Sequence, residues 1–196
     1  MSKIQNLKPE IRYLYDMRKV LYDKKWVKNA KNFPVYYIWR GLKEKNGLRY
    51  DITDITSRVL GQEFSKTKGH EHPDSCSELI IVHEGKAFFL FQKTKGKSVK
   101  DVYTIPAKSG EVIIAPTGYA HITINPSKRK LKIANWIDEK CKGKYEFIEK
   151  MGGACYFYTK SGWIKNKNYD IIPKLRFEKP LKSTPKNLDF LKKCSK

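Results

Sequence analysis

The sequence has no long run of apolar residues. No window of its 196 residues approaches the roughly 18 apolar residues of a membrane-spanning helix. The first residues, MSKIQNLKPEIRYLYD, also lack the apolar core of a signal peptide. No segment recurs with a period of about 20 to 50 residues, which argues against a solenoid or a propeller. We therefore expect a single cytoplasmic domain that has no membrane partner.

Cysteine is scarce. The four cysteines, Cys76, Cys141, Cys155 and Cys194, form no C-x-x-C pair, so the spacing typical of a zinc finger is missing. No secretory signal places them in an oxidising compartment, and we therefore expect reduced thiols.

Acidic residues are about half as frequent as basic ones. The chain carries 20 Asp and Glu against 41 Lys and Arg, for a net charge of +21. Such a field attracts anions, including nucleic acids, anionic lipids and phosphorylated metabolites. Lysines are scattered over the whole chain, with a denser stretch over 179–196, and no helix-turn-helix, zinc-finger or ribonucleoprotein motif accompanies them. We interpret the excess as a solvated basic surface and do not expect nucleic acid binding, despite the charge.

Short runs rich in Val, Ile, Tyr and Phe follow one another from residue 35. They are separated by glycine, Lys-Asn-Gly and Pro-Ser-Lys breaks, a pattern typical of antiparallel strands in a sandwich or barrel. Helical spacing of apolar residues predicts a helix over 12–23, and a second helix over 145–151 ends at a Gly-Gly pair. The predicted organisation is a helical N-terminal extension over 1–34, a β-barrel domain over 35–160 and a basic C-terminal extension over 161–196.

Three of the four histidines fall close to one glutamate in this pattern. His70 and His72 are two residues apart and project from the same face of a strand, Glu78 opens the next apolar run, and His121 lies in another strand. Each of these has an ordinary structural explanation on its own, and His83 is expected to be structural or exposed. Together, three imidazoles and one carboxylate suit Fe(II), Mn, Ni, Co or Zn and leave coordination positions open.

Two segments that contain these residues resemble the cupin motifs. The first motif is matched from Glu78 to Gly85, with its leading glycine displaced to Gly61 or Gly69. The second motif, G-x5-P-x-G-x2-H-x3-N, is matched in full by Gly110, Pro116, Gly118, His121 and Asn125. The resemblance implies an all-β cupin fold, a double-stranded β-helix or jelly-roll barrel, with short N- and C-terminal helical extensions. It also implies a metal held by His70, His72, Glu78 and His121.

A larger part of the chain, from about residue 12 to 169, resembles the cupin-type glucose-6-phosphate isomerases. The similar segments are IRYLYDMRKVLYD, LRYDIT, KTKGH, ANW and EKMGGACYFY. The resemblance implies a homodimer that interconverts glucose 6-phosphate and fructose 6-phosphate, in glycolysis or gluconeogenesis, with one divalent metal per chain. Fe(II) is the first choice of metal. Glu78 would be both ligand and proton-transferring base, and a metal-assisted hydride shift is the alternative.

The same resemblance implies the residues that bind the substrate. Hydroxyls and a glycine N–H are suitable donors to a phosphate, and aromatic rings can close a sugar site. The implied residues are Tyr36, Thr53, Thr67 and Gly69 for the phosphate, and Trp136 and Tyr145 for the sugar.

The chain departs from some relatives at two positions. Ile80 stands where some relatives have a tyrosine, and Gly143 and Lys144 stand near the place of a histidine. Such changes are compatible with another activity on the same fold. The alternatives are an Fe(II) dioxygenase, another sugar-phosphate isomerase or epimerase, and a non-enzymatic cupin that binds a sugar or a phosphate.

Overall fold

The computed structural model describes residues 7–73 and 75–195, and the side chains of the latter segment as far as residue 192. Strands dominate, and the helices are short. The strands are β1 (Glu10–Tyr13), β2 (Pro34–Lys45), β3 (Leu48–Ile55), β4 (Val59–Leu60), β5 (Glu63–Phe64), β6 (His70–Glu71), β7 (Glu78–Glu84), β8 (Lys86–Lys95), β9 (Ser98–Lys108), β10 (Val112–Ala115), β11 (Ala120–Ile124), β12 (Leu131–Asp138), β13 (Tyr156–Thr159), β14 (Gly162–Lys165) and β15 (Arg176–Phe177). The helices are α1 (Leu14–Met17), η2 (Arg18–Val20), α2 (Lys24–Asn29), α3 (Glu146–Lys150) and η3 (Asp189–Ser195).

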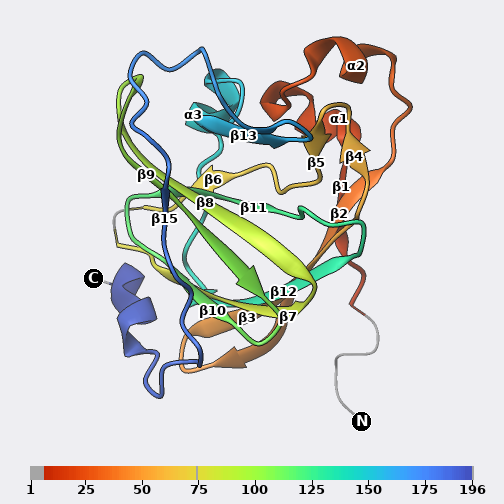
Figure 1. Cartoon of the computed structure of the whole chain (residues 1–196). Helices are drawn as coiled ribbons and strands as arrows, with labels where there is room; N and C mark the ends of the chain where they lie inside the picture. The colour runs from red at the N-terminus through yellow and green to blue at the C-terminus, as the bar shows by residue number, and fades with distance from the viewer. Residues whose placement is uncertain (1–6, 74, 196) are drawn as a thin grey trace.

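The strands form two large sheets that face each other (Figure 1). The first has six strands in the order β1-β2-β3-β12-β7-β10, and the second has five in the order β15-β9-β8-β11-β6. A small sheet, β14-β13-β5-β4, lies near the helices α1, α2 and α3 at the top of this view. The prediction of an all-β protein is confirmed.

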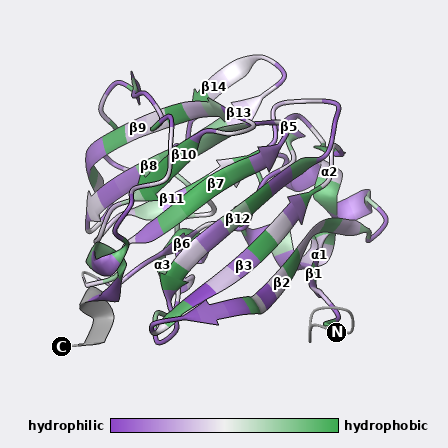
Figure 2. Ribbon diagram, turned by 90° about the horizontal axis from the view of Figure 1, so that it is seen from below, coloured by the Kyte–Doolittle hydropathy of each residue, from purple (hydrophilic) through white to green (hydrophobic). Residues whose placement is uncertain are grey.

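The core lies between the two large sheets, because their strands alternate apolar and polar side chains. Ile80 and Val82 of β7 pack there with Phe89 and Phe91 of β8, and all four side chains are buried. Figure 2 views the six-stranded sheet from below and shows apolar and polar bands alternating along its strands. Alternation of this kind places every second residue of β3, β7 and β12 on the inner face.

The N-terminal segment is not the continuous helix that we predicted over 12–23. Residues 10–13 form β1, which pairs antiparallel with β2, and only then do the short helices α1 and η2 follow. The predicted apolar positions are nevertheless buried: Leu14, Met17, Val20 and Leu21 have no exposed surface. The edge of β2 offers backbone partners to this segment, and pairing with it replaces the helical hydrogen bonds.

The C-terminal segment is attached to the sheets at several points. The hairpin of β13 and β14 runs across the expected boundary at 160/161. Further on, β15 pairs parallel with β9, and Leu181 forms an isolated bridge with Val112. The helix predicted over 145–151 corresponds to α3.

The cysteines are not all alike. Cys141 and Cys155 are buried free thiols, as expected. Cys76 is disulfide-bonded, so the prediction of a reduced thiol is wrong there. Spacing along the sequence does not reveal disulfide pairing, which is why the prediction failed there, and the side chain of Cys194 lies outside the described residues.

Within the described residues, no helix has the length and apolar character needed to cross a membrane.

Candidate metal centre and active site

A cavity of about 320 Å³ opens between the two large sheets. The inner faces of β2, β3, β7 and β12 form one wall, and β11, the segment 67–72 that contains β6, and the segment 141–145 form the rest. This volume is within the range of pockets that bind small molecules. The cavity therefore has room for a compact polar ligand.

Four side chains converge at one end of this cavity. His70 of β6 lies directly opposite His121 of β11 in the strand register, and Glu78 begins β7. The ligand atoms of His70, His72, Glu78 and His121 all lie within 4.8 Å of one another. Nε2 of His70 is 2.7 Å from Nε2 of His72, and Glu78 Oε2 is 3.4 Å and 3.3 Å from Nε2 of His72 and His121.

These distances fit a divalent metal ion. Atoms that coordinate one ion at about 2.0–2.2 Å lie roughly 3 Å apart, as these do. Glu78 Oε2 is buried and accepts no hydrogen bond within the described part of the chain. A buried carboxylate oxygen without a donor is costly unless a cation satisfies it. The geometry and the unsatisfied oxygen both favour a metal centre here.

The charge state of the cluster is also that of a metal site. Burial, and then the neighbouring His121, His72 and Arg40, lower the pKa of His70 well below its ordinary value. Burial likewise lowers the pKa of His72 to about 4. Burial acts to raise the pKa of Glu78, but His121, His72 and Arg40 together outweigh it, and the pKa is lowered. Near neutral pH, two neutral imidazoles and a carboxylate are therefore ready to bind a cation.

Five of the six residues expected to bind substrate line the same cavity. They are Tyr36, Thr53, Thr67, Gly69 and Tyr145. The Tyr36 hydroxyl accepts a hydrogen bond from the Lys68 N–H at 3.3 Å, and Thr67 Oγ1 accepts one from the Thr123 N–H at 3.0 Å. The Tyr145 ring lies 5.6 Å from the His70 ring, between centroids. These hydroxyl groups and the cluster of three histidines and Glu78 thus line the same cavity.

Comparison with known proteins identifies the family. A family model described as "Glucose-6-phosphate isomerase (GPI)" matches residues 15–174, which is most of the chain. The chain belongs to the glucose-6-phosphate isomerase family. The resemblance found in the sequence motifs is thereby confirmed.

The similar relatives in this family are archaeal. The glucose-6-phosphate isomerase of Pyrococcus abyssi is 31% identical over 129 residues, which cover 62% of this chain and 66% of the relative. That of Thermococcus litoralis is 30% identical, with 62% and 65% covered. The match therefore spans slightly less than two thirds of the length of these relatives.

Solved structures with related folds are more distant. A cupin-2 domain protein from Shewanella frigidimarina is 21% identical, with a TM-score of 0.37 and coverage of 51% of this chain and 78% of that one. Oxalate decarboxylase from Lactobacillus farciminis is 15% identical, with a TM-score of 0.47 and coverage of 60% and 34%. Likeness at this level says nothing about the reaction.

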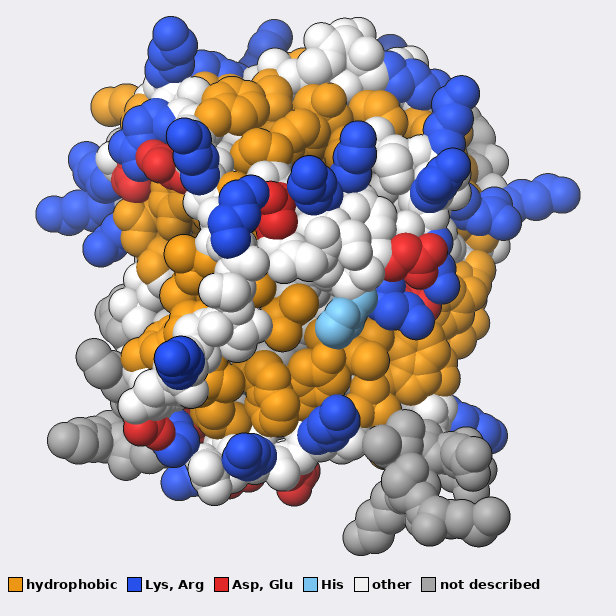
Figure 3. Space-filling model, turned by 60° about the horizontal axis from the view of Figure 1, so that its bottom comes forward, with side chains coloured by type: hydrophobic (Ala, Val, Ile, Leu, Met, Phe, Trp, Pro, Cys, Tyr) orange, Lys and Arg blue, Asp and Glu red, His pale blue; other side chains and the backbone are white. Residues whose placement is uncertain are grey.

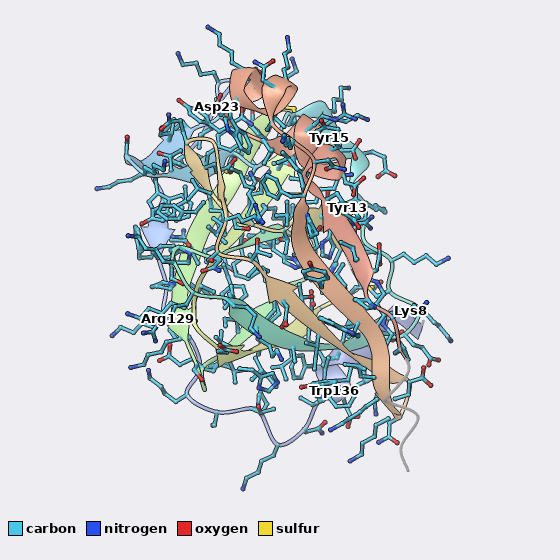
Figure 4. The ribbon with its side chains drawn as sticks, turned by 90° about the vertical axis from the view of Figure 1, so that its right-hand side faces the viewer. Lys8, Tyr13, Tyr15, Asp23, Arg129 and Trp136 are labelled. Carbon is cyan, nitrogen blue, oxygen red and sulfur yellow. The ribbon has the colours of Figure 1, made fainter. Side chains whose placement is uncertain are left out.

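Trp136, the sixth residue expected at the substrate, does not line the cavity of this glucose-6-phosphate isomerase family member. Asn135 and Ile137 face the cavity, so the residue between them faces the opposite side of β12. There the Trp136 ring packs 4.9 Å from the Tyr50 ring, near η3 (Figure 4). Strand alternation decides the direction of the side chain, so the structure does not bring Trp136 to the cavity with the other five residues.

Sequence reasoning missed several residues that line the cavity of this family member. Arg40, Arg49, Asp51, Asn135 and Lys142 all contribute to its walls. The period of two along LRYDIT places Asp51 on the same face as Thr53, so this signal was present in the sequence. The same period of two along β2 places Arg40 on the face of Tyr36 and Ile38, which also line the cavity, so this signal was present too.

Ile80 and Gly143, which the sequence motifs singled out, also lie at the cavity. Ile80 presents an apolar side chain to it. Gly143 packs directly on His70, since a Cβ atom at this position would lie 2.4 Å from His70 Cδ2. A side chain at position 143 therefore has no room while His70 keeps its orientation.

Proposed function

We propose that this chain is a metal-dependent aldose–ketose isomerase that interconverts glucose 6-phosphate and fructose 6-phosphate, in glycolysis or gluconeogenesis. The observation that carries the proposal is the shared cavity. A cluster of three histidines and Glu78 lies at one end of it, in a chain of the glucose-6-phosphate isomerase family, and hydroxyl groups suited to a phosphate line the same space. The reaction needs these components: an electrophile at two sugar oxygens, a base at carbon, and an anchor for the phosphate.

His70, His72, Glu78 and His121 would hold the metal. A divalent ion bound there supplies Lewis-acid polarisation of the C1 and C2 oxygens of the sugar. Fe(II) is our first choice, and Mn, Ni, Co and Zn suit the same three-nitrogen, one-oxygen set.

Glu78 would move the proton. Its lowered pKa keeps the side chain as a carboxylate, and its burial next to the histidines excludes bulk water. In the aldose-to-ketose direction, a Glu78 oxygen removes the proton from C2 and returns it to C1 while the C1 oxygen is protonated and the C2 hydroxyl loses its proton. The alternative is a hydride shift, in which hydrogen moves from C2 to C1 with its electron pair and Glu78 only positions the sugar.

The phosphate would bind at the other end of the cavity. The Tyr36, Thr53 and Thr67 hydroxyls and the Gly69 N–H supply donors from two facing walls. Because the chain carries a net charge of +21, the field around the molecule also attracts a phosphorylated sugar. Tyr145 would cover the sugar between the phosphate and the metal.

A coupled assay tests the proposal. Purified protein is assayed for conversion of fructose 6-phosphate to glucose 6-phosphate as isolated, after chelation, and after addition of each candidate metal. Activity that is lost on chelation and restored by one metal supports the isomerase and identifies its ion. Absence of activity with one metal bound per chain would overturn it and direct attention to other sugar phosphates and to oxygen chemistry.

Solvent exchange separates the two chemical routes. The reaction is run in D2O and the product is analysed by mass spectrometry. Deuterium incorporated at C1 of fructose 6-phosphate indicates proton transfer through Glu78. Retention of the original hydrogen over complete turnover indicates the hydride shift.

We also propose a cytoplasmic homodimer that forms through the outer face of the six-stranded sheet. Aromatic side chains gather on this face, with Tyr37 stacked on Trp39 and Tyr50 packed against Trp136. Figure 3 shows hydrophobic side chains across this side of the molecule, with lysines and arginines around them. Size-exclusion chromatography with light scattering tests the dimer, and a monomer at micromolar concentration would overturn it.

A further inference from the structure

An irregularity in the pairing of β2 with β3 lies at the wall of the cavity. Trp39 pairs with Ile52 and Lys43 with Tyr50, so three residues of β2 stand opposite a single residue, Asp51, of β3. The extra residues include Gly41, which has a φ of +67°. Glycine adopts this conformation without the strain that a side chain would bring. Bulges of this kind re-aim side chains, and they are over-represented next to active sites.

Asp51 is the residue around which the bulge is built. Its side chain is buried, and Oδ1 accepts a hydrogen bond from the Gly41 N–H at 2.8 Å. The Arg49 Nε lies 2.9 Å and 3.1 Å from the two carboxylate oxygens, and Arg40 Nη1 lies 3.5 Å from Oδ2. One buried carboxylate therefore holds the bulge and orients two guanidinium groups that line the cavity.

Arg40 keeps hydrogen-bonding capacity toward the cavity. A guanidinium has five N–H donors, and the contacts of Arg40 with described residues use Nε, toward Glu10 at 3.1 Å, and Nη1, toward Asp51. Its weak contact with Asp51 contrasts with the close contact of Arg49. The Arg40 side chain is 42% exposed, so it lies at the boundary between cavity and solvent.

The sheet register places Arg40 on the inward-facing cross-strand row next to the row of Glu78, with β3 and β12 between their strands. Asp51 lies opposite Asn135, and Asn135 lies opposite Ile80 on β7, two residues beyond Glu78. Ile80 offers no hydrogen-bond donor, so on this cross-strand row the donors are Arg40 and Asn135. Arg40 lines the same cavity as His70 and Glu78.

We propose that Arg40 is a catalytic residue whose guanidinium donates hydrogen bonds to the sugar oxygens that become negatively charged during isomerisation, and that Asp51 positions it. This inference rests on the proposed function. When Glu78 takes the C2 proton, the electron pair of the broken C–H bond passes into the C1–C2 unit, and the negative charge falls on the attached oxygens. Arg40 stays protonated throughout and stabilises that charge, which the neutral ground-state sugar lacks.

Two anionic probes distinguish this role from phosphate binding. Gluconate 6-phosphate has a planar anion at C1, and glucitol 6-phosphate has the same phosphate and hydroxyls without that anion. Titration calorimetry on metal-loaded protein compares the wild type with Arg40→Gln. We expect gluconate 6-phosphate to bind about 10- to 100-fold more weakly to the variant, as for the loss of a hydrogen bond to a charged group, and glucitol 6-phosphate to change by less than about threefold.

Kinetics supply a second readout. Arg40→Gln should lower kcat by about 100-fold with little change in KM, since the contact forms mainly in the transition state. Arg40→Lys keeps the charge and should recover part of the loss. Arg129→Gln removes one exposed arginine that does not line the cavity, labelled at the left of Figure 4, and serves as the charge-matched control. Thermal unfolding of each variant verifies that it is folded.

Three outcomes would overturn the inference. If Arg40→Gln weakens the binding of both probes equally, Arg40 contacts the phosphate. If neither binding nor kcat changes, Arg40 does not contact the ligand. If Arg129→Gln has an effect of the same size, the effect of Arg40→Gln comes from the change in net charge alone. Failure of the proposed function is distinguishable from these. In that case the metal-loaded wild type itself neither isomerises fructose 6-phosphate nor binds either probe.

Discussion

The two walls of the cavity are held in place by different means. The wall that carries His70 and His121, here called the histidine wall, is fixed by backbone pairing, since the register of β6 and β11 brings these two residues together. The wall that carries Arg40 and Arg49, here called the arginine wall, is held by one buried carboxylate, Asp51, which lies opposite the bulge of β2. A wall fixed by backbone pairing suits the strict geometry that a metal requires. A wall of long side chains on a carboxylate suits recognition of charge, which tolerates more movement.

The largest effect on metal content and activity is expected when one histidine of the histidine wall is removed. His121→Ala removes a nitrogen from the four-residue cluster. Metal content should fall well below one ion per chain, and isomerase activity should fall by at least about 100-fold, because even substitutions behind the ligands cost 10- to 100-fold in metal affinity. Metal analysis by mass spectrometry and the coupled assay measure both quantities.

His83→Ala is the matched control for that experiment. His83 is exposed on β7, where its Nε2 lies 2.8 Å from the Tyr50 hydroxyl, and it is absent from the cavity lining. This variant should keep its metal and its activity. Stoichiometric metal in His121→Ala would refute the ligand assignment, and equal loss in both variants would point to misfolding.

A smaller effect on metal affinity is expected when a side chain is introduced at Gly143, which packs against His70. Gly143→Ala introduces a Cβ where only 2.4 Å separates it from His70 Cδ2, so the imidazole or the segment 141–145 must shift. We expect metal affinity to fall by about 10- to 100-fold while the fold is retained. Competition with a fluorescent chelator measures the affinity, with no need for turnover.

Lys144→Ala controls for substitution in the same segment. Its backbone pairs with Glu71 in both directions, and the exposed side chain can be removed without disturbing that pairing. If Gly143→Ala and Lys144→Ala bind metal equally well, His70 does not depend on the glycine, and the histidine wall is less tightly packed than we conclude.

Thr67→Ala tests the proposed phosphate contact on the cavity wall. The Thr67 hydroxyl lines the cavity and already accepts the Thr123 N–H, so its own proton remains for a substrate oxygen. KM for fructose 6-phosphate should rise by about five- to tenfold, as for loss of one hydrogen bond. Binding of unphosphorylated fructose, measured in parallel, should not change. Equal weakening of both would remove the phosphate contact.

The histidine wall could be predicted from sequence because its ligands follow strand periodicity and motif spacing. The period of two put His70 and His72 on one face, and the motifs added Glu78 and His121. The same reasoning would have excluded Trp136 had the alternation along LKIANWID been followed, since Asn135 and Ile137 take the inner face.

The arginine wall could be predicted only in part. The period of two places Arg40 on the inner face, but the sequence of β2 alone carries no signal for the bulge, in which the Gly41 N–H donates to the carboxylate of Asp51 on another strand. Likewise, β1 replaces part of a predicted helix because the edge of β2 is available. Both features arise from contacts between distant segments, and periodicity along one segment carries no information about them.

The smallest expected effect concerns two aromatic residues, Tyr145 and Trp136, that were both predicted from the sequence to contact the sugar. Tyr145 lines the cavity, whereas Trp136 packs on Tyr50 at the outer face of the sheet. Tyr145→Phe should raise KM for fructose 6-phosphate by about three- to tenfold through loss of its hydroxyl. Trp136→Phe keeps an aromatic ring against Tyr50 and should leave kcat/KM within about twofold of the wild type. A rise in KM for Trp136→Phe alone would mean that the outer face, and not the cavity between the two walls, meets the sugar.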